Sequence, residues 1–159
     1  MNSGTLRNDT IIKSGQLTYS TVSNIINDVL VVKEVSGSII LEMLEYSVFN
    51  LPNTFAGSFL FVSGIKYTYD YRKNPRVQSV EIGGVPLDLH RMYSLTTFSY
   101  LSGGGDGFSM IRNCKYIVDP VGGIDLLRLL LRFFKGLESG FDLNKKVSET
   151  EEKEKVPTS

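Results

Sequence analysis

Apolar and polar positions alternate with two different periods along this chain. A period of two, or a short run of β-branched residues, predicts strands over residues 29–35, 59–62, 65–70, 76–82, 92–98 and 116–118. A helical period predicts helices over residues 19–24, 38–49 and 125–137. Neighbouring strands with helices on their outer faces favour an α+β fold over a regular parallel sheet.

Polar residues mark where the first two helices begin. Thr18 is suited to cap the first helix, and Ser36 or Gly37 the second. The third helix, over 125–137, is apolar nearly all round and carries three basic residues on its polar side. We expect this helix to be buried or docked. It is too short to span a bilayer.

Composition and charge exclude several classes of partner. The chain has 159 residues, enough for one domain with a core, and its 17 Lys and Arg residues balance 17 Asp and Glu residues. This balance argues against nucleic acid or an anionic membrane as a partner held by bulk charge. No apolar run is long enough to cross a membrane, and residues 1–15 lack the apolar stretch of a secretory signal. The charged stretch 141–159 predicts a disordered tail, which leaves residues 1–140 as the domain.

Residue types suited to catalysis are scarce. The chain has one histidine, His90, which we expect on the surface, and one cysteine, Cys114, which we expect to be small and at least half-buried. A single histidine and a single cysteine leave no cluster for zinc or a two-metal centre. We therefore expect neither a catalytic residue nor a metal ligand in this chain.

A glycine-rich loop follows the strand predicted over 92–98. Residues 99–108 read Ser-Tyr-Leu-Ser-Gly-Gly-Gly-Asp-Gly-Phe. Glycines let the backbone approach a ligand, the carboxylate of Asp106 can accept hydrogen bonds from a vicinal diol, and Tyr100 offers a flat face to a heterocycle. These features suit a nucleoside site. The alternative interpretation is a wide turn with Asp106 in or near the left-handed region.

Five blocks of sequence, in order, carry a family resemblance. They are Asn-Ser-Gly-Thr-Leu-Arg at 2–7, Gly-Gln-Leu-Thr-Tyr at 15–19, Glu-Val-Ser-Gly at 34–37 with Leu-Glu-Tyr-Ser-Val at 44–48, Phe-Leu-Phe-Val-Ser-Gly-Ile-Lys-Tyr at 59–67, and Ser-Gly-Gly-Gly-Asp-Gly-Phe at 102–108. Their ordered combination resembles the C-terminal domain of the 5'-nucleotidases, the group of ecto-5'-nucleotidase, UDP-sugar hydrolase and apyrases. The resemblance covers most of residues 2–135 and implies a layered α/β/β/α domain.

The resemblance implies a substrate-binding role for several residues. Arg7 matches the arginine that binds the substrate phosphate, a task suited to the planar guanidinium, and Asn2 matches the asparagine that contacts the nucleoside. Tyr100 falls on the second of two aromatic positions that sandwich the base. Asp106 falls on the aspartate that holds the ribose hydroxyls.

Other positions either support this site or depart from the family pattern. Gly104 and Gly105 would let the loop approach the sugar. The first stacking position falls on Leu30, an aliphatic residue, and the family's Leu-Pro-Phe-Gly-Asn segment is replaced around residues 25–28. We therefore expect a different base specificity, with Phe98 as an alternative aromatic wall.

The resemblance also implies what this chain lacks. In the family, a separate N-terminal metallophosphoesterase domain holds a pair of divalent metal ions. This chain would be the half that recognises a nucleotide, within an enzyme that converts nucleoside phosphates to nucleoside and phosphate, and alone it would be inactive. The family also implies a cell-surface, secreted or periplasmic location.

Two other functions stay open. The departures at Leu30 and at residues 25–28 suit cyclic nucleotides, UDP-sugars or diphosphates as substrates on the same scaffold. A non-catalytic interaction module, in which the apolar helix over 125–137 docks a partner, is the other alternative. A nucleotide site requires that Arg7, Tyr100 and Asp106 reach the same cavity.

Overall fold

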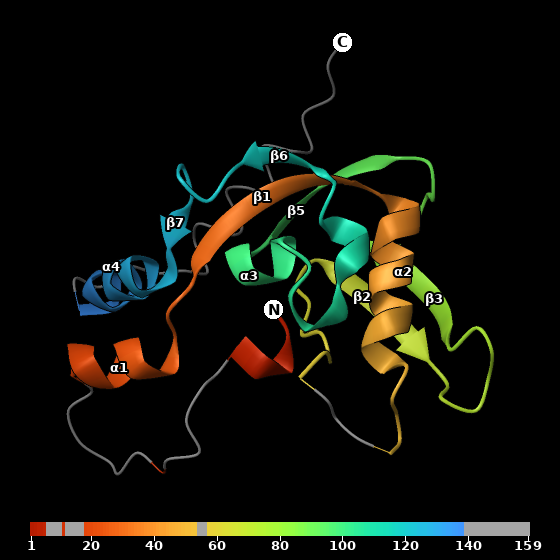
Figure 1. The fold of residues 1–159 in the computed structure, drawn as a ribbon, viewed down its shortest axis with the longest axis horizontal. Coiled ribbons are helices and arrows are strands. Elements are labelled where there is room, and N and C mark those ends of the chain that lie inside the picture. The colour runs from red at the N-terminus through yellow and green to blue at the C-terminus, as the bar shows by residue number, and fades with distance from the viewer. Residues whose placement is uncertain (6–10, 12–17, 54–56, 139–159) are drawn as a thin grey trace. The chain divides into compact units, whose positions relative to one another are not determined.

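Helices and two antiparallel sheets make up the described part of this protein (Figure 1). The computed structural model describes residues 1–5, 11, 18–53 and 57–138. The predicted α+β class is confirmed, since every strand pairing between described residues is antiparallel. The described residues divide into two units, with the boundary between Leu127 and Arg128. Arg7 and the predicted tail over 141–159 lie outside the described residues.

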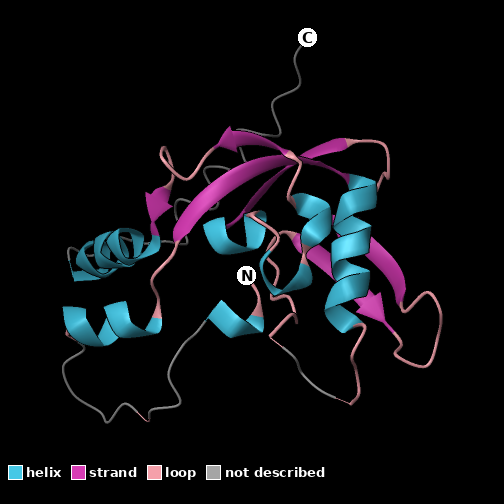
Figure 2. Ribbon diagram, viewed as in Figure 1, coloured by secondary structure: helices cyan, strands magenta, loops and turns pink. Residues whose placement is uncertain are grey.

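The first sheet is built around one long strand. Its strands are β1 (Val29–Ser36), β5 (Met92–Phe98), β6 (Lys115–Val118) and β7 (Ile124–Asp125). β1 lies in the centre, with β5 along one edge and β6 and β7 along the other (Figure 2). Val31, Lys33 and Val35 alternate along β1 and are all buried. The β-branched run therefore forms a strand whose inner face supplies part of the core.

The second sheet is a smaller meander. Its strands are β2 (Ile65–Tyr69), β3 (Val77–Ile82) and β4 (Val85–Pro86), in that spatial order. The turn from β3 to β4 is made by Gly83 and Gly84, both at positive φ, as a tight hairpin requires. The turn predicted by the glycine pair is therefore confirmed.

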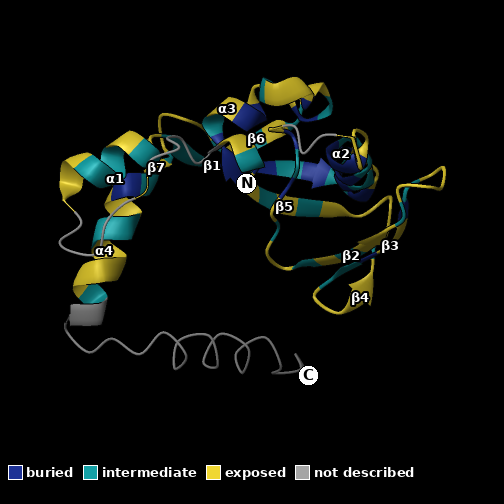
Figure 3. Cartoon of the chain, turned by 90° about the horizontal axis from the view of Figure 1, so that it is seen from below, coloured by how far each residue is buried: buried dark blue, intermediate teal, exposed yellow. Residues whose placement is uncertain are grey.

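Helix α2 (Gly37–Val48) joins the two sheets into one core. The Ser36 side chain accepts a hydrogen bond from the Ile39 backbone N–H and caps the helix, as predicted. Buried residues of α2 lie together with buried residues of both sheets and of the segment that follows β5. Figure 3 shows this burial concentrated on β1 and α2. The core cluster consists of Val35, Ile40, Met43, Leu44, Val48, Leu51, Leu60, Val77, Val80, Leu101, Phe108 and Ile111.

Short helical turns follow β5 and shape the glycine-rich segment. They are α3 (Ser99–Ser102) and the 3-10 turns η2 (Gly105–Gly107) and η3 (Ser109–Ile111); a further turn, η1 (Ser3–Thr5), lies near the start of the chain. The segment predicted as a loop is thus a chain of single turns.

Two further helices were predicted correctly. Helix α1 (Tyr19–Ile25) begins at Thr18, whose side chain accepts a hydrogen bond from the Thr21 backbone N–H. Helix α4 (Leu126–Glu138) lies within one residue of the predicted bounds, but among its described side chains only Leu127 is buried, contrary to the expected burial. No helix among the described residues is both long and apolar enough to cross a membrane.

The strand predicted over residues 59–62 is wrong for this structure. Only Leu60 in this stretch forms a bridge, and its partner is Asn2. Backbone bonds from Ser3 to Phe59 (2.8 Å) and from Phe61 to Met1 (2.7 Å) flank the bridge. A strand needs a partner along its length, and the first residues of this chain supply one for only a few positions.

Candidate functional site

A polar cavity of about 320 Å³ lies where the start of the chain meets the glycine-rich segment. Its lining residues come from four separate parts of the sequence. They are Asn2, Gly4, Asn27, Asp28, Gly57, Phe98, Tyr100 and Asp106. Three residues predicted for the site, Asn2, Tyr100 and Asp106, are therefore brought together.

Asn2 connects the start of the chain to the glycine-rich segment. Its side-chain amide donates a hydrogen bond to the Gly57 carbonyl (2.8 Å) and a second one to Oδ2 of Asp106. The antiparallel pairing with Leu60 holds the backbone of Asn2, and the residue is almost fully buried. An amide that is anchored at both backbone and side chain keeps the carboxylate of Asp106 in a fixed orientation.

Asp106 occupies the left-handed backbone region, as the alternative interpretation of this segment as a wide turn had it. Its φ is 50° and its ψ is 27°, between Gly104 at φ 92° and Gly107 at φ 86°. The Tyr46 hydroxyl donates to the Asp106 carbonyl, and the Tyr100 hydroxyl donates to Oδ1 of its side chain, each at 3.1 Å. Contacts to backbone and carboxylate together stabilise a conformation that few residues other than glycine adopt.

Two glycines of this segment are required by neighbouring tyrosines. A Cβ on Gly105 would lie 2.5 Å from the ring of Tyr100, and a Cβ on Gly107 would lie 1.8 Å from the hydroxyl of Tyr46. From the sequence, these glycines were expected to let the backbone approach a ligand. The structure adds a second reason, because the loop backbone packs directly on two tyrosine rings.

The two aromatic residues at the cavity differ sharply in exposure. Tyr100, on α3, is 54% exposed, whereas Phe98, at the end of β5, is 5% exposed. Phe108 closes the segment as a fully buried core residue, with its ring edge-on to Tyr46. Tyr100 therefore presents a ring to incoming molecules, while Phe98 forms a fixed wall.

A buried lysine of the first sheet binds the backbone just after the glycine-rich segment. Lys33, on β1, is fully buried, and its ammonium donates to the carbonyls of Ile111 (2.9 Å) and Arg112 (2.8 Å). The same ammonium lies 4.1 Å from the ring centre of Tyr116, a cation–π contact. At the other end, Nε of Arg112 donates to the Gly103 carbonyl (2.9 Å). Lys33 was not among the predicted site residues, because its position in an apolar strand carries no signal for distant carbonyls.

Asn27 and Asp28 are a second addition to the predicted site. Oδ1 of Asp28 accepts hydrogen bonds from the Val29 N–H and the Ser99 hydroxyl, each at 2.7 Å. These bonds join the start of β1 to the start of α3 and place both residues at the cavity. The sequence showed this stretch only as a departure from the family pattern. A carboxylate directly before a strand was the signal that could have identified it.

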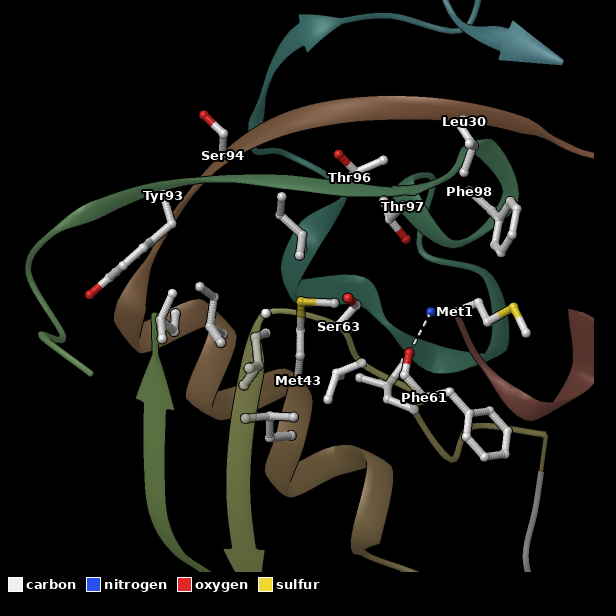
Figure 4. Close-up of a pocket in the computed structure, with 18 residues that line it drawn as sticks. Met1, Leu30, Met43, Phe61, Ser63, Tyr93, Ser94, Thr96, Thr97 and Phe98 are labelled. Carbon is white, nitrogen blue, oxygen red and sulfur yellow. Dashed lines mark hydrogen bonds between the residues drawn. The ribbon is translucent and has the colours of Figure 1, made fainter. Parts of the chain in front are cut away.

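Other predicted residues lie elsewhere. Leu30 does not line the polar cavity; it lines an apolar cavity of about 750 Å³ and reaches it beside Phe98, which lines both (Figure 4). Arg7 falls outside the described residues. His90 is exposed and Cys114 is half-buried, as predicted.

The side chains of the described residues form no group suited to hold a metal ion. Within residues 1–5, 11, 18–53 and 57–138, no three His, Cys, Asp or Glu side chains come together in a group that could hold one. Asp28 and Asp106 line the polar cavity without a third such residue. No metal-dependent step can therefore be derived from these residues.

Comparison with known proteins identifies the domain type. The model of the family "5'-nucleotidase, C-terminal domain" matches residues 1–113. An apyrase of Tabanus yao is 40% identical over 95 residues, which cover 52% of this chain and 17% of the apyrase. A 5'-nucleotidase of Mus musculus is 34% identical over 90 residues, covering 50% of this chain and 16% of the mouse protein.

Solved structures agree with this match. The crystal structure of a 5'-nucleotidase precursor from Thermus thermophilus superimposes with a TM-score of 0.72 and 32% identity, over 86% of this chain and 28% of that one. The NAD nucleotidase of Haemophilus influenzae gives a TM-score of 0.67 and 26% identity, over 84% of this chain and 26% of that one.

The chain therefore belongs to the 5'-nucleotidase C-terminal domain family, and the predicted resemblance is confirmed. It spans about a sixth of the length of the apyrase and the mouse 5'-nucleotidase.

Proposed function

We propose that this domain recognises a nucleotide, as the substrate-binding part of a 5'-nucleotidase-like hydrolase. One observation carries the proposal: Asn2, Tyr100 and Asp106, which are far apart in the sequence, line one polar cavity. An amide, an exposed aromatic ring and a carboxylate are the groups that a nucleoside requires. Family membership supports the same assignment.

The carboxylate of Asp106 binds the ribose hydroxyls. It accepts one hydrogen bond from Asn2 at Oδ2 and one from Tyr100 at Oδ1. A carboxylate can accept about four hydrogen bonds, so capacity remains for two hydroxyl donors of a vicinal diol. Gly104 and Gly105, on the same loop, give its backbone the freedom to approach the sugar.

The base stacks on Tyr100. Its ring is more than half exposed at the mouth of the cavity, and stacking on an aromatic ring stabilises a bound base by about 1 kcal/mol or more. Phe98 provides the opposing wall in place of Leu30, which lines the other cavity. Asn27 and Asp28 add an amide and a carboxylate, which favour a base that offers N–H donors.

Hydrolysis belongs to another part of the enzyme. The described residues supply no metal cluster, and we place the divalent metal pair in a separate N-terminal metallophosphoesterase domain. Arg7 is the proposed ligand of the substrate phosphate, since a guanidinium binds phosphate through two parallel hydrogen bonds. On this proposal the chain alone binds nucleotides without cleaving them.

Titration of the full chain with AMP and with adenosine, followed by amide NMR shifts, tests this proposal. We expect shifts at Asn2, Tyr100 and Asp106 for both ligands, and tighter binding of AMP through Arg7. Asp106→Asn should weaken both ligands about tenfold, equivalent to about 1.4 kcal/mol. Asp88→Asn makes the same chemical change at an exposed turn and should leave affinity unchanged.

Two outcomes separate the alternatives. Stronger shifts with a cyclic nucleotide, a UDP-sugar, a diphosphate or NAD than with AMP would assign the same cavity to that substrate class. No shift at the cavity with any of these ligands at millimolar concentration would overturn the proposal and favour a non-catalytic interaction module. In that module α4, with Leu129 and Phe133 each about 40% exposed, is the surface to test.

A further inference from the structure

Two carboxylates line the polar cavity, those of Asp28 and Asp106. Among the described residues that line it there is no lysine, arginine or histidine. A ligand therefore meets this part of the cavity with hydrogen-bond donors, since its anionic phosphate would be repelled there. Asp106 is bonded to Asn2 and Tyr100 and is the proposed acceptor for the sugar. Asp28 remains as an acceptor for another part of the ligand.

The carboxylate of Asp28 is held at one of its two oxygens. Oδ1 accepts hydrogen bonds from the Val29 N–H and the Ser99 hydroxyl, each at 2.7 Å. The backbone carbonyl of Asp28 accepts from the Leu126 N–H at 3.1 Å. Oδ2 accepts no hydrogen bond from any described residue. The side chain is therefore held in place while both lone pairs of Oδ2 stay available to a ligand.

The two carboxylates are bonded to different ends of the residue on which the base stacks. The Tyr100 hydroxyl, at the tip of the ring, donates to Asp106. The hydroxyl that donates to Asp28 belongs to Ser99, which directly precedes Tyr100 on α3. A nucleoside stacked on this ring can therefore direct its sugar to Asp106 and an edge of its base to Asp28.

We propose that Asp28 selects guanine as the base, an inference that rests on the proposed function. Guanine offers two neighbouring donors, N1–H and the 2-amino group, and Oδ2 of Asp28 has a lone pair for each. Adenine and cytosine offer one amino group beside a ring nitrogen whose lone pair a carboxylate repels. Hypoxanthine and uracil offer a single N–H between two carbonyls. Guanine is therefore the base that this acceptor satisfies best, and a base that leaves it unpaired is rejected.

The neighbouring amide of Asn27 does not decide between the bases. It lines the same cavity, and an amide can both donate and accept. It can donate to the 6-carbonyl of guanine or accept from the 6-amino group of adenine. Discrimination therefore rests on Asp28, because an ionised carboxylate only accepts hydrogen bonds.

The hydrogen bonds at Oδ1 make Asp28→Asn a change at a single atom. Because the Val29 N–H can only donate, the amide oxygen of the variant takes the place of Oδ1, and the NH2 group takes the place of Oδ2. The acceptor that serves the ligand thus becomes a donor, while the side chain stays anchored. Xanthine carries a carbonyl where guanine carries its 2-amino group. The variant should therefore prefer xanthine to guanine.

Calorimetric titration of the full chain with GMP, IMP, AMP and XMP measures this preference. We expect GMP to bind about tenfold more tightly than AMP or IMP, as one added hydrogen bond to a charged group predicts. Asp28→Asn should weaken GMP at least about tenfold and bind XMP more tightly than GMP. Asp119→Asn is the matched control, since Oδ1 of this exposed residue also accepts two hydrogen bonds. It should leave the order of the four nucleotides unchanged.

Two further measurements separate the possible outcomes. Amide NMR shifts at Asn2, Tyr100 and Asp106 show whether each nucleotide occupies the polar cavity, and equal unfolding temperatures of the two variants exclude a loss of fold. Equal affinity for GMP and AMP in the unmodified chain would overturn the assignment of Asp28, as would an Asp28→Asn variant that still prefers GMP to XMP. Shifts at the cavity would leave the proposed function standing in both cases. No shift with any of the four nucleotides would overturn the proposed function, and the role of Asp28 with it.

Discussion

The polar and the apolar cavity both include Phe98, yet their walls are held in different ways. Hydrogen bonds from Asn2, Tyr46 and Tyr100 converge on Asp106 in the polar cavity. The apolar cavity is lined mainly by apolar side chains, and the backbones of Met1 and Phe61, which also line it, are joined by hydrogen bonds. This difference shows that hydrogen bonds hold the polar cavity in a fixed geometry, whereas the apolar cavity is lined mainly by apolar side chains.

The largest expected effect comes from removing the lysine that binds the backbone just after the glycine-rich segment. Lys33→Met deletes two hydrogen bonds and a cation–π contact and leaves the carbonyls of Ile111 and Arg112 without this donor. We expect a loss of about 3 kcal/mol in the free energy of unfolding, measured by urea denaturation. Lys66→Met, on the exposed side of β2, should change it by less than about 0.5 kcal/mol. Equal losses would mean that Lys33 does not anchor the segment.

A pair of glycine substitutions separates backbone strain from packing around the polar cavity. Gly84 and Gly107 have similar positive φ values, 78° and 86°, but only Gly107 lies against another residue, Tyr46. Gly84→Ala should therefore cost about 1 kcal/mol, from strain alone. Gly107→Ala should cost at least about 1 kcal/mol more, because Tyr46 must move from Phe108 and Asp106. Thermal unfolding of both variants checks the difference; similar values would show that the Tyr46 contact is unimportant.

The exposed ring of Tyr100 gives a smaller test, which concerns the ligand. On the proposed function, Tyr100→Leu should weaken AMP about fivefold, near 1 kcal/mol, with little change in stability. Tyr71→Leu, at an exposed tyrosine outside the lining of both cavities, serves as the control. Isothermal titration calorimetry measures both. Unchanged affinity in the Tyr100 variant would remove stacking from the proposed mode of binding.

The smallest effect is expected at an ion pair outside both cavities. Hydrogen bonds from the Arg72 side chain and backbone lower the pKa of Asp70 from 3.8 to about 2. This pair therefore stabilises the folded state above about pH 4, and the contribution is lost as the pH falls towards 2. Asp70→Asn should flatten the fall in unfolding temperature between pH 4 and pH 2. If the unfolding temperature of the variant falls as steeply as that of the unmodified chain, the Asp70–Arg72 pair is not the cause of the fall.

Elements with a strong local pattern were predictable from sequence. The alternation over residues 92–98 gives β5 at its observed bounds, and helical spacing after a serine cap gives α2 within one residue. Asn2, Tyr100 and Asp106 were identified because their sequence blocks resemble a family, and the structure places them at one cavity. Position along the chain alone would not have joined them.

The errors have physical causes that lie outside the local sequence. Residues 59–62 carry a strand pattern but have a partner for only a few positions. Lys33 stands at an inward position of β1, and its burial depends on carbonyls more than 70 residues away. The family resemblance placed Leu30 at the base, and this stays a prediction; in the structure Leu30 lines the apolar cavity, while Asn27 and Asp28 line the polar one.

The burial of Lys33 has a practical consequence for following motion in this protein. Its amine is fully buried and donates to the carbonyls of Ile111 and Arg112, so reagents that acylate lysines cannot reach it in the folded structure. Exposed lysines such as Lys66 and Lys115 are open to the same reagents at all times. The rate at which Lys33 becomes labelled, measured by peptide mass spectrometry, therefore reports how often the region around Ile111 and Arg112 opens.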